Sequence, residues 1–224
     1  MKSSGVATDW REIDQYDGGF GWIAHPDETI QRASHAFAVD GDVWLVDPVD
    51  TEGIDDRIAD LGEVAGVVIL LDRHRRDSAA LATRHGVSVR VPAFIDGVAA
   101  ELDAPVERFR HNLADTGFAV HEVVDNRLWQ EGLLYNEDSG TLIVPEAVGT
   151  TEYFRTGDRP LGVHPVLRLT PPSKLARLSP DRLLVGHGDG IHDHAAGALE
   201  EAVDGARSRA PALYWKNLRM LVSG

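Results

Sequence analysis

The stretch "VVILLDRHRRDSAALATRHG", residues 67–86, runs from an unbroken apolar segment into a cluster of charge and then into a pattern of small residues. The apolar segment is too short for a free-standing helix and is typical of a strand buried on both faces. After it, Asp77 can cap the start of a helix and Gly86 can end that helix. A strand pattern returns at residues 87–92, so the stretch predicts a βαβ unit with charged side chains at the end of its first strand.

The residues before this stretch predict a hairpin and a short helix. Two apolar-rich segments, 34–39 and 43–46, flank Asp40 and Gly41, a dipeptide that favours a two-residue hairpin turn. Apolar residues then recur at helical spacing over 54–61. The first half of the chain therefore supplies a hairpin-rich sheet with helices.

The second half has more strands and a proline-rich connection. The connection at 159–180 predicts a surface excursion with one short helix, and the end of the chain predicts a helix up to about Arg209 and a second from Pro211. Strand patterns lie at 118–124, 133–135, 141–144 and 181–185. We therefore expect an α/β fold in which two sheets pack face to face with helices outside.

Length and composition predict one domain over residues 1–224. The hydrophobic content of 43% supports a full core without disulfides. There are no cysteines, which excludes thiolate zinc sites and thiol nucleophiles and favours a cytoplasmic protein. No segment has the pattern of a signal peptide or an apolar run of about 18 residues, so we expect neither export by that route nor a membrane span.

The charge of the chain is strongly negative. The formal charge is −14, from 36 acidic and 22 basic residues, and the only lysines are Lys2, Lys174 and Lys216. Such a field repels nucleic acid and anionic membranes, so we expect neither as a partner. Acidic, lysine-poor surfaces resemble those of salt-adapted proteins, and we expect a halophile as the source; an ordinary acidic cytosolic protein is the alternative.

Acids and imidazoles follow three of the predicted strands. The first strand end carries Asp72, His74 and Asp77, the second carries Glu146, and the third carries His187. The carboxyl ends of strands are where ligand sites of α/β proteins collect. Carboxylate and imidazole that converge from separate strands suit a zinc, iron or manganese ion, so we expect these residues to reach a common cleft.

The order of these segments resembles the metallo-β-lactamase-like hydrolase superfamily over about residues 15–205. The hairpin "SHAFAVDGDVWLVDPV" is similar to a family strand pair ending in Asp, and residues 67–77 lead into the position of the family's H-x-H-x-D-H motif. The segments "GTLIVPEAV" and "LLVGHG" are similar to the family's strand ending in Gly-Asp and to its last His. The resemblance implies a four-layer αββα sandwich with one or two metal ions in a cleft. Most family members hydrolyse esters, thioesters, amides or phosphodiesters, and a minority carry out redox chemistry.

The sequence departs from the family motif at most metal positions. Aligned with that motif, Asp72 replaces the first His, His74 matches the second, Arg76 replaces the Asp and Asp77 replaces the last His. A slip of one residue would instead let Asp77 serve as the motif's Asp. Glu146 replaces the bridging Asp, while the family's Pro-Gly-His turn is replaced by a segment that contains Arg127, Leu128 and Trp129.

Two functions follow from the residues that remain. The first is a mononuclear metal-dependent hydrolase of a small-molecule ester, thioester or phosphoester, in which Asp77 or Asp72 orients or deprotonates the nucleophile. The second is a metal-free scaffold of the same fold, because a guanidinium can replace a cation beside buried carboxylates. The metal ligands would be Asp72, His74, Asp77, Glu146 and His187. The scaffold would bind an anionic ligand or a protein partner through Arg73, Arg75, Arg76 and Arg127.

Structural roles also explain these residues. Asp77 can be only a helix cap, Asp72 and its neighbouring arginines can be surface ion pairs, and Glu146 can face solvent. His74 and His187 can be buried structural histidines. The residues 213–218 near the end, "LYWKNL", can form a homodimer contact, although their spacing favours a stripe that faces the core.

The salt-adapted interpretation predicts that the protein becomes more stable as salt is added. Raising potassium chloride from roughly 0.1 M to 1 M shortens the screening length from about 10 Å to about 3 Å, which relieves repulsion among the surface carboxylates. We expect the melting temperature, followed by circular dichroism, to rise across this series. A protein that melts highest in dilute buffer would contradict the interpretation.

Overall fold

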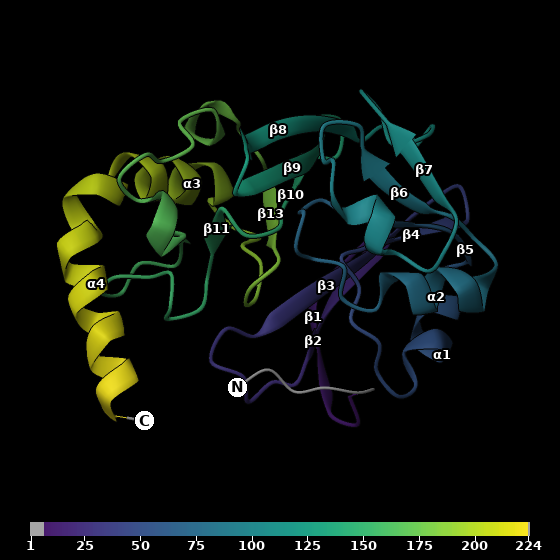
Figure 1. Ribbon diagram of the computed structural model, residues 1–224, viewed down its shortest axis with the longest axis horizontal. Helices are drawn as coiled ribbons and strands as arrows, with labels where there is room; N and C mark the ends of the chain where they lie inside the picture. The colour runs from purple at the N-terminus through teal and green to yellow at the C-terminus, as the bar shows by residue number, and fades with distance from the viewer. Residues whose placement is uncertain (1–6, 224) are drawn as a thin grey trace.

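Two mixed β-sheets pack against each other in the computed structural model, which describes residues 7–223 and their side chains as far as Met220 (Figure 1). The larger sheet has seven strands in sequential order. Its strands β1 to β4 are antiparallel, and β4 to β7 are parallel. The strands are β1 (Trp10–Tyr16), β2 (Gly19–Ala24), β3 (Arg32–Val39), β4 (Asp42–Val46), β5 (Glu63–Val68), β6 (Val89–Pro92) and β7 (Val106–Phe109).

The smaller sheet has four strands in the order β13-β10-β9-β8. Strands β8 to β10 form an antiparallel meander, and β13 returns to lie parallel to β10. A separate two-stranded pair joins β11 to β12. These strands are β8 (Ala119–Asn126), β9 (Trp129–Asn136), β10 (Thr141–Val144), β11 (Val148–Gly149), β12 (Gly162–Val163) and β13 (Arg182–Val185).

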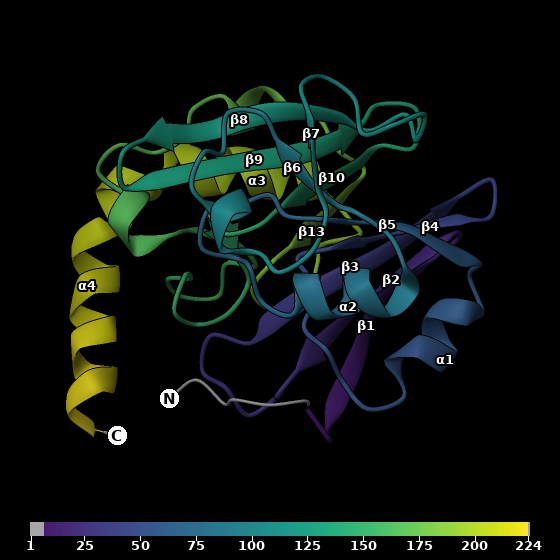
Figure 2. The same cartoon turned by 45° about the vertical axis from the view of Figure 1, so that its right-hand side comes forward.

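Helices cover the outer face of each sheet, which confirms the predicted αββα sandwich. The helices α1 and α2 bury Ile54, Ile58 and Leu81 against the larger sheet, whereas α3 buries Leu199 and neighbouring residues against the smaller one. Figure 2 shows these helices on opposite sides of the two sheets. Their bounds are α1 (Ile54–Ala59), α2 (Ser78–His85), α3 (Ala195–Asp204) and α4 (Ala206–Ser223), with 3-10 turns η1 (Val98–Glu101), η2 (Pro165–Leu167) and η3 (Leu175–Arg177).

The central core lies between the sheets and holds them in register with each other. Val68 of β5 and Leu70, which follows β5, pack against Leu134, Ile143 and Leu184 of the smaller sheet. All five side chains are at most 1% exposed. Burial of such side chains stabilises a fold by roughly 1.5–3 kcal/mol each, so this layer fixes how the strand ends of the two sheets meet.

The local signals in the sequence produce the predicted turns. Asp40 and Gly41 connect β3 to β4 with φ angles of 53° and 91°, the left-handed conformation that such a hairpin turn requires. Gly86 ends α2 with a φ of 69°, again as expected for a glycine after a helix. The unit β5-α2-β6 is parallel, as the opening stretch predicts.

The C-terminal helices differ from the prediction. The break lies at Gly205, between α3 and α4, and Pro211 lies inside α4. Pro211 is about one and a half turns into α4, where it removes one backbone hydrogen bond without ending the helix. The predicted end near Arg209 is therefore wrong by about one turn.

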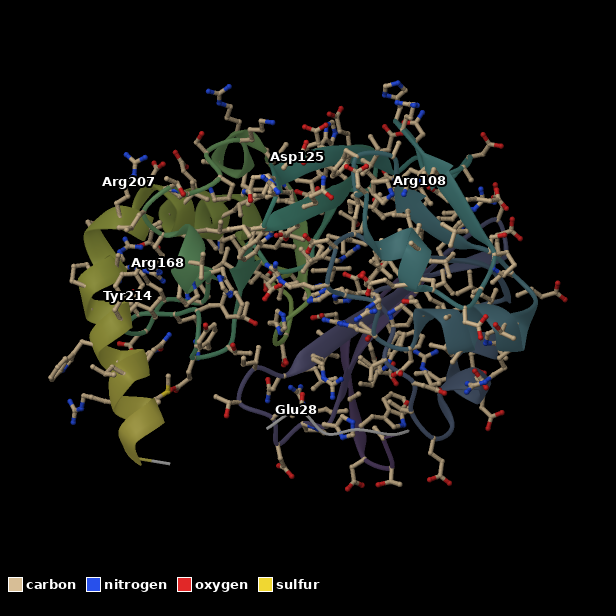
Figure 3. The ribbon with its side chains drawn as sticks, in the orientation of Figure 1. Glu28, Arg108, Asp125, Arg168, Arg207 and Tyr214 are labelled. Atoms are coloured by element: carbon tan, nitrogen blue, oxygen red, sulfur yellow. The ribbon has the colours of Figure 1, made fainter. Side chains whose placement is uncertain are left out.

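The predicted core-facing stripe at 213–218 is also wrong. Leu213 is fully buried, but Trp215 is 63% exposed and Leu218 is 53% exposed. The hydroxyl of Tyr214 donates a hydrogen bond to the carbonyl of Pro165, and Figure 3 shows Tyr214 on α4 near Arg168. The homodimer stays a prediction. Among the described residues, no helix is both long and apolar enough to cross a membrane.

Candidate metal centre

Three strand ends bring two imidazoles and a carboxylate to one place. His74 follows β5, Glu146 follows β10 and His187 follows β13. One ligand atom of each residue lies within 4.8 Å of the others. We call these residues the triad. The sequence predicted that distant segments would bring these side chains to a common cleft, and the structure places them there.

Hydrogen bonds orient both imidazoles with Nε2 toward the centre of the triad. Nδ1 of His74 lies 3.1 Å from Oδ2 of Asp47, and Nδ1 of His187 lies 2.9 Å from the carbonyl oxygen of Ile30. Carboxylate and carbonyl oxygens accept, so each Nδ1 carries the proton and each Nε2 presents a lone pair. Partners of this kind commonly orient histidines that bind metals.

The Nε2 atom of His187 is buried and has no hydrogen-bond partner among the described residues. Burial lowers the pKa of His187 well below its ordinary value, and the nearby His74 and Arg76 lower it further. The ring therefore stays neutral and keeps its lone pair. A buried lone pair without a donor is costly, and a metal ion would satisfy it. The residues present therefore fit one ion bound by two histidines and a carboxylate.

Glu131 fixes the backbone at Glu146, the carboxylate residue of the triad. It is fully buried, and its Oε1 accepts the backbone N–H groups of Glu146 and Ala147, each at 2.7 Å. Its Oε2 accepts the indole N–H of Trp129 at 2.7 Å. Burial raises the pKa of Glu131 to about 7, against the opposing effect of these donors. The Trp129 ring in turn supports Arg73, whose guanidinium carbon lies 3.8 Å from the ring centroid and whose Nε donates to Oε2 of Glu146 at 3.0 Å.

Arg76 forms a second fixed positive charge beside the triad. Its guanidinium donates to the carbonyl oxygens of Ala33, Asp47 and Gly186. Ala33 and Asp47 lie at the ends of strands of the larger sheet, and Gly186 follows β13 of the smaller sheet. Arg76 therefore links the two sheets at the site. Burial lowers its pKa to about 10 despite the nearby Asp47. Arg76 and Asp47 both have left-handed φ angles, 43° and 44°, and such backbone strain in non-glycine residues often occurs at functional sites.

Two of the predicted ligands use their carboxylates elsewhere. Oδ2 of Asp72 accepts the backbone N–H of Gln130 at 2.9 Å, and Oδ2 of Asp77 accepts the backbone N–H of Asp50 at 2.9 Å. Asp77 stands before α2 but makes no side-chain cap hydrogen bond to it. Of the five residues predicted as ligands, the structure gathers three into the triad.

The four predicted anion-binding arginines also divide. Arg73 and Arg76 line the cavity at the triad. Arg75 forms an exposed ion pair with Glu101, and Arg127 is exposed at the turn between β8 and β9. Neither Arg75 nor Arg127 lines the cavity at the triad.

Three adjoining cavities surround the triad. The central cavity, about 330 Å³, shares Arg73 and Glu146 with a second cavity and shares Glu28 and Thr29 with a third. The central cavity is lined by Glu28, Thr29, Ile30, Arg32, Arg73, His74, Arg76, Glu146 and His187. The second, which we call the apolar cavity, measures about 430 Å³ and is lined by Arg73, Asn126, Leu128, Trp129, Glu146, His164, Val166, Leu167 and Thr170.

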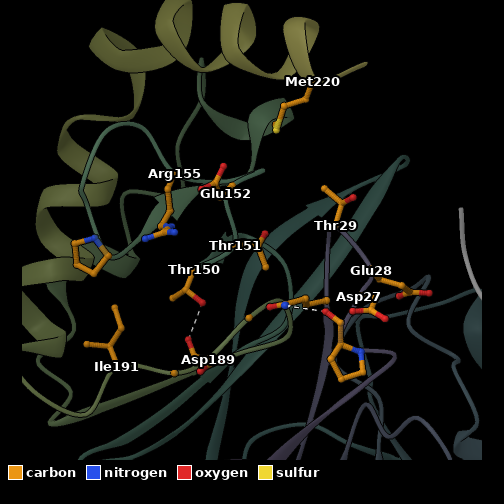
Figure 4. Close-up of a pocket in the computed structure, with 15 residues that line it drawn as sticks. Asp27, Glu28, Thr29, Thr150, Thr151, Glu152, Arg155, Asp189, Ile191 and Met220 are labelled. Atoms are coloured by element: carbon orange, nitrogen blue, oxygen red, sulfur yellow. Dashed lines mark hydrogen bonds between the residues drawn. The ribbon is translucent and has the colours of Figure 1, made fainter. Parts of the chain in front are cut away.

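The third cavity, which we call the acidic cavity, measures about 620 Å³. Figure 4 shows Asp27 and Glu28 on the wall opposite Arg155, with Met220 of α4 at its edge. It is lined by Pro26, Asp27, Glu28, Thr29, Gln31, Thr150, Thr151, Glu152, Arg155, Pro160, Gly188, Asp189, Gly190, Ile191 and Met220. The triad therefore lies between an apolar and an acidic recess.

Sequence reasoning missed three residues that shape this centre. Asp47 ends the predicted hairpin "VWLVD", and this strand-end position could have indicated its role. Glu131 lies between the predicted strands 118–124 and 133–135, in the segment that replaces the family's Pro-Gly-His turn, and its residue type gives no signal there. His164 has no partner pattern in the sequence, yet its Nε2 lies 3.6 Å from Oε1 of Glu146. Its partners come from segments far apart in the chain, so no local spacing reveals them.

The sandwich and the strand-end triad together define a protein with the metallo-β-lactamase fold. No family model and no curated protein matches the sequence. Among solved structures, the DIM-1 metallo-β-lactamase is similar at 14% identity and a TM-score of 0.64, with 91% of this chain and 98% of that chain covered. TMB-1 is similar at 14% identity and a TM-score of 0.58, with 89% and 98% covered.

A flavodiiron protein is also similar. The Flv1 flavodiiron core from Synechocystis sp. PCC6803 has 12% identity and a TM-score of 0.67, with 92% of this chain and 62% of that chain covered. Identities this low show the shared fold alone. They confirm the fold expected from the sequence resemblance and leave the chemistry to be argued from the site.

The hydrogen bonds of Arg76 predict a large loss of stability in an Arg76→Ala variant. Three carbonyl oxygens would lose a charged donor, and we expect the free energy of unfolding in urea to fall by about 2–4 kcal/mol. Arg75→Ala is the matched control, because its exposed ion pair contributes at most about 1 kcal/mol. Equal effects of the two substitutions would contradict this role of Arg76.

Proposed function

We propose that this protein is a mononuclear metal-dependent hydrolase of an ester, thioester or phosphoester. The observation that carries the proposal is the unpartnered Nε2 of His187, which is buried beside Glu146 and His74. His74, Glu146 and His187 would hold one zinc, iron or manganese ion. Two histidines and a carboxylate leave an open position for water.

A bound divalent cation lowers the pKa of water toward about 7 and polarises the scissile carbonyl or phosphoryl group. The residues of this chain supply orientation. Asp47 keeps the proton of His74 on Nδ1, and the carbonyl of Ile30 does the same for His187. Arg73 donates to Oε2 of Glu146 and so limits how this carboxylate can turn.

The proton of the attacking water needs an acceptor. Oε1 of Glu146 faces His164, whereas Oε2 binds Arg73. We propose that Oε1 takes the proton and returns it to the leaving group. The water oxygen then bonds to the acyl carbon or phosphorus as the bond to the leaving atom breaks. The alternative base, Asp77, stays a prediction, and an Asp77→Asn variant with unchanged kcat would exclude it.

Metal content is the direct test of this proposal. We expect protein purified without chelator, or reloaded and desalted, to hold about one equivalent of zinc, iron or manganese by plasma mass spectrometry. His187→Ala should lose the metal. His192→Ala is the control, because His192 is exposed and bonds Asp14 rather than the triad. Less than about a tenth of an equivalent in the reloaded wild-type protein would refute a metal centre.

The Asp47 hydrogen bonds predict a specific effect of Asp47→Asn. The backbone N–H of Leu70 donates to Oδ1 of Asp47, so the asparagine oxygen stays there and its amide N–H₂ faces His74. That amide can only donate, which moves the imidazole proton from Nδ1 to Nε2 and removes the lone pair toward the triad. We expect affinity for zinc to fall about 10–100-fold in competition with a chelating dye.

Asp72→Asn is the matched control for this measurement. Asp72 accepts a backbone N–H of β9, and its other carboxylate oxygen lies 3.6 Å from a guanidinium nitrogen of Arg73, not beside a triad residue. We expect unchanged zinc affinity. A loss with Asp72→Asn instead of Asp47→Asn would favour Asp72 as the ligand and would contradict the triad.

The second candidate function is metal-free binding of an anion by the arginines. The observation that favours it is that Arg32, Arg73 and Arg76 line the central cavity. Arg76 is engaged by carbonyl oxygens, and Arg73 and Arg32 already pair with Glu146 and Glu28. A rise in melting temperature with phosphate but not with zinc would favour this function; ligand present at about 100 times its Kd stabilises by about 2.7 kcal/mol.

A further inference from the structure

The apolar cavity is lined by exposed hydrophobic side chains next to the triad. Leu128 at the turn between β8 and β9 is 87% exposed, and Val166 in η2 is 69% exposed. A single exposed apolar side chain needs no explanation. These two belong to different segments and flank one recess, whose floor includes the buried Trp129 and Leu167. The recess therefore combines four apolar side chains with the polar side chains of Arg73, Asn126, Glu146, His164 and Thr170.

The charged groups around the apolar cavity provide little positive charge that could bind an anion. Arg73 is the one basic side chain among the described residues that line it, and this arginine already bonds Glu146 and lies over Trp129. On the other side of the triad, four carboxylates and one arginine line the acidic cavity. Glu28 and Asp189 pair with Arg32 and Arg11, but Asp27 and Glu152 still oppose an anionic group there. The two recesses therefore suit an uncharged substrate.

His164 supplies a hydrogen-bond donor between the apolar cavity and the triad. Its Nδ1 accepts the backbone N–H of Val166 at 3.3 Å, so the proton of the neutral ring lies on Nε2. The rings of Trp129, Tyr153 and Phe154 surround the imidazole with centroids 4.8–5.7 Å away. The donor is therefore held in place at the wall that includes Glu146.

We infer that the apolar cavity binds the apolar acyl group of an uncharged carboxylic ester, whose carbonyl oxygen accepts a hydrogen bond from Nε2 of His164. This inference rests on the proposed hydrolase function and names its substrate class. The water oxygen bonds to the carbonyl carbon, and the ester C–O bond breaks. The water proton passes through Oε1 of Glu146 to the leaving alkoxide, so the products are a carboxylic acid and an alcohol.

The test compares 4-nitrophenyl acetate, butyrate and octanoate with bis(4-nitrophenyl) phosphate on metal-loaded protein. Each methylene buried from water contributes about 0.8 kcal/mol, so we expect kcat/KM to rise at least about tenfold from acetate to octanoate. The phosphodiester should be the poorer substrate. Metal content is measured on the same samples.

Three variants separate the parts of the inference. Leu128→Asp should raise KM for the octanoate about tenfold or more. The matched control is Leu169→Asp, because Leu169 is 63% exposed two residues after η2 but does not line the cavity. His164→Phe keeps a ring and removes the donor, so kcat should fall about 100-fold with unchanged metal content.

Binding without catalysis gives a second measurement. The ketone 2-decanone carries the chain and the carbonyl group but no cleavable bond. By calorimetry, Leu128→Asp should weaken its binding about tenfold, whereas Leu169→Asp should not. Metal-loaded protein that prefers the phosphodiester, or that shows no dependence on acyl length, would overturn this inference alone. Protein that binds no metal would overturn the proposed function instead.

Discussion

The hydrogen bonds of Asp47 connect the fold to the candidate metal centre. Its carboxylate accepts from the backbone of Leu70 and lies 3.1 Å from Nδ1 of His74, while its carbonyl oxygen accepts from Ser34 and Arg76. One residue therefore fixes the end of β4, the segment after β5 and the tautomer of a candidate ligand. Burial raises the pKa of Asp47 to about 6. The ionised carboxylate is therefore costly to maintain, and the nearby Arg76 stabilises it.

The architecture could be predicted from the sequence because its signals are local. The Asp40-Gly41 turn, the glycine after α2 and the apolar run before Asp72 each report on a few neighbouring residues. The C-terminal region was less predictable. Pro211 is a strong local signal for a break, yet the helix continues through it and places Trp215 in solvent.

The candidate site could be predicted only in part. Strand ends indicated His74, Glu146 and His187, and the structure brings them together. Whether Asp72 and Asp77 would face the same point depends on the turn after β5, where Arg76 adopts a left-handed conformation. Such a turn has no signature in residue type. Glu131 and His164 act through contacts between segments far apart in the chain, and a single sequence does not reveal these pairings.

Arg76 has a consequence for how this site can change over evolutionary time. The resemblance to the family motif puts Arg76 at the position of that motif's aspartate, and its guanidinium donates to carbonyl oxygens at the ends of both sheets. Placing an aspartate at this position in one step would remove the charged donor from those oxygens and add a carboxylate close to Asp47. Arg76 therefore makes a one-step change to an acidic side chain at this position unfavourable.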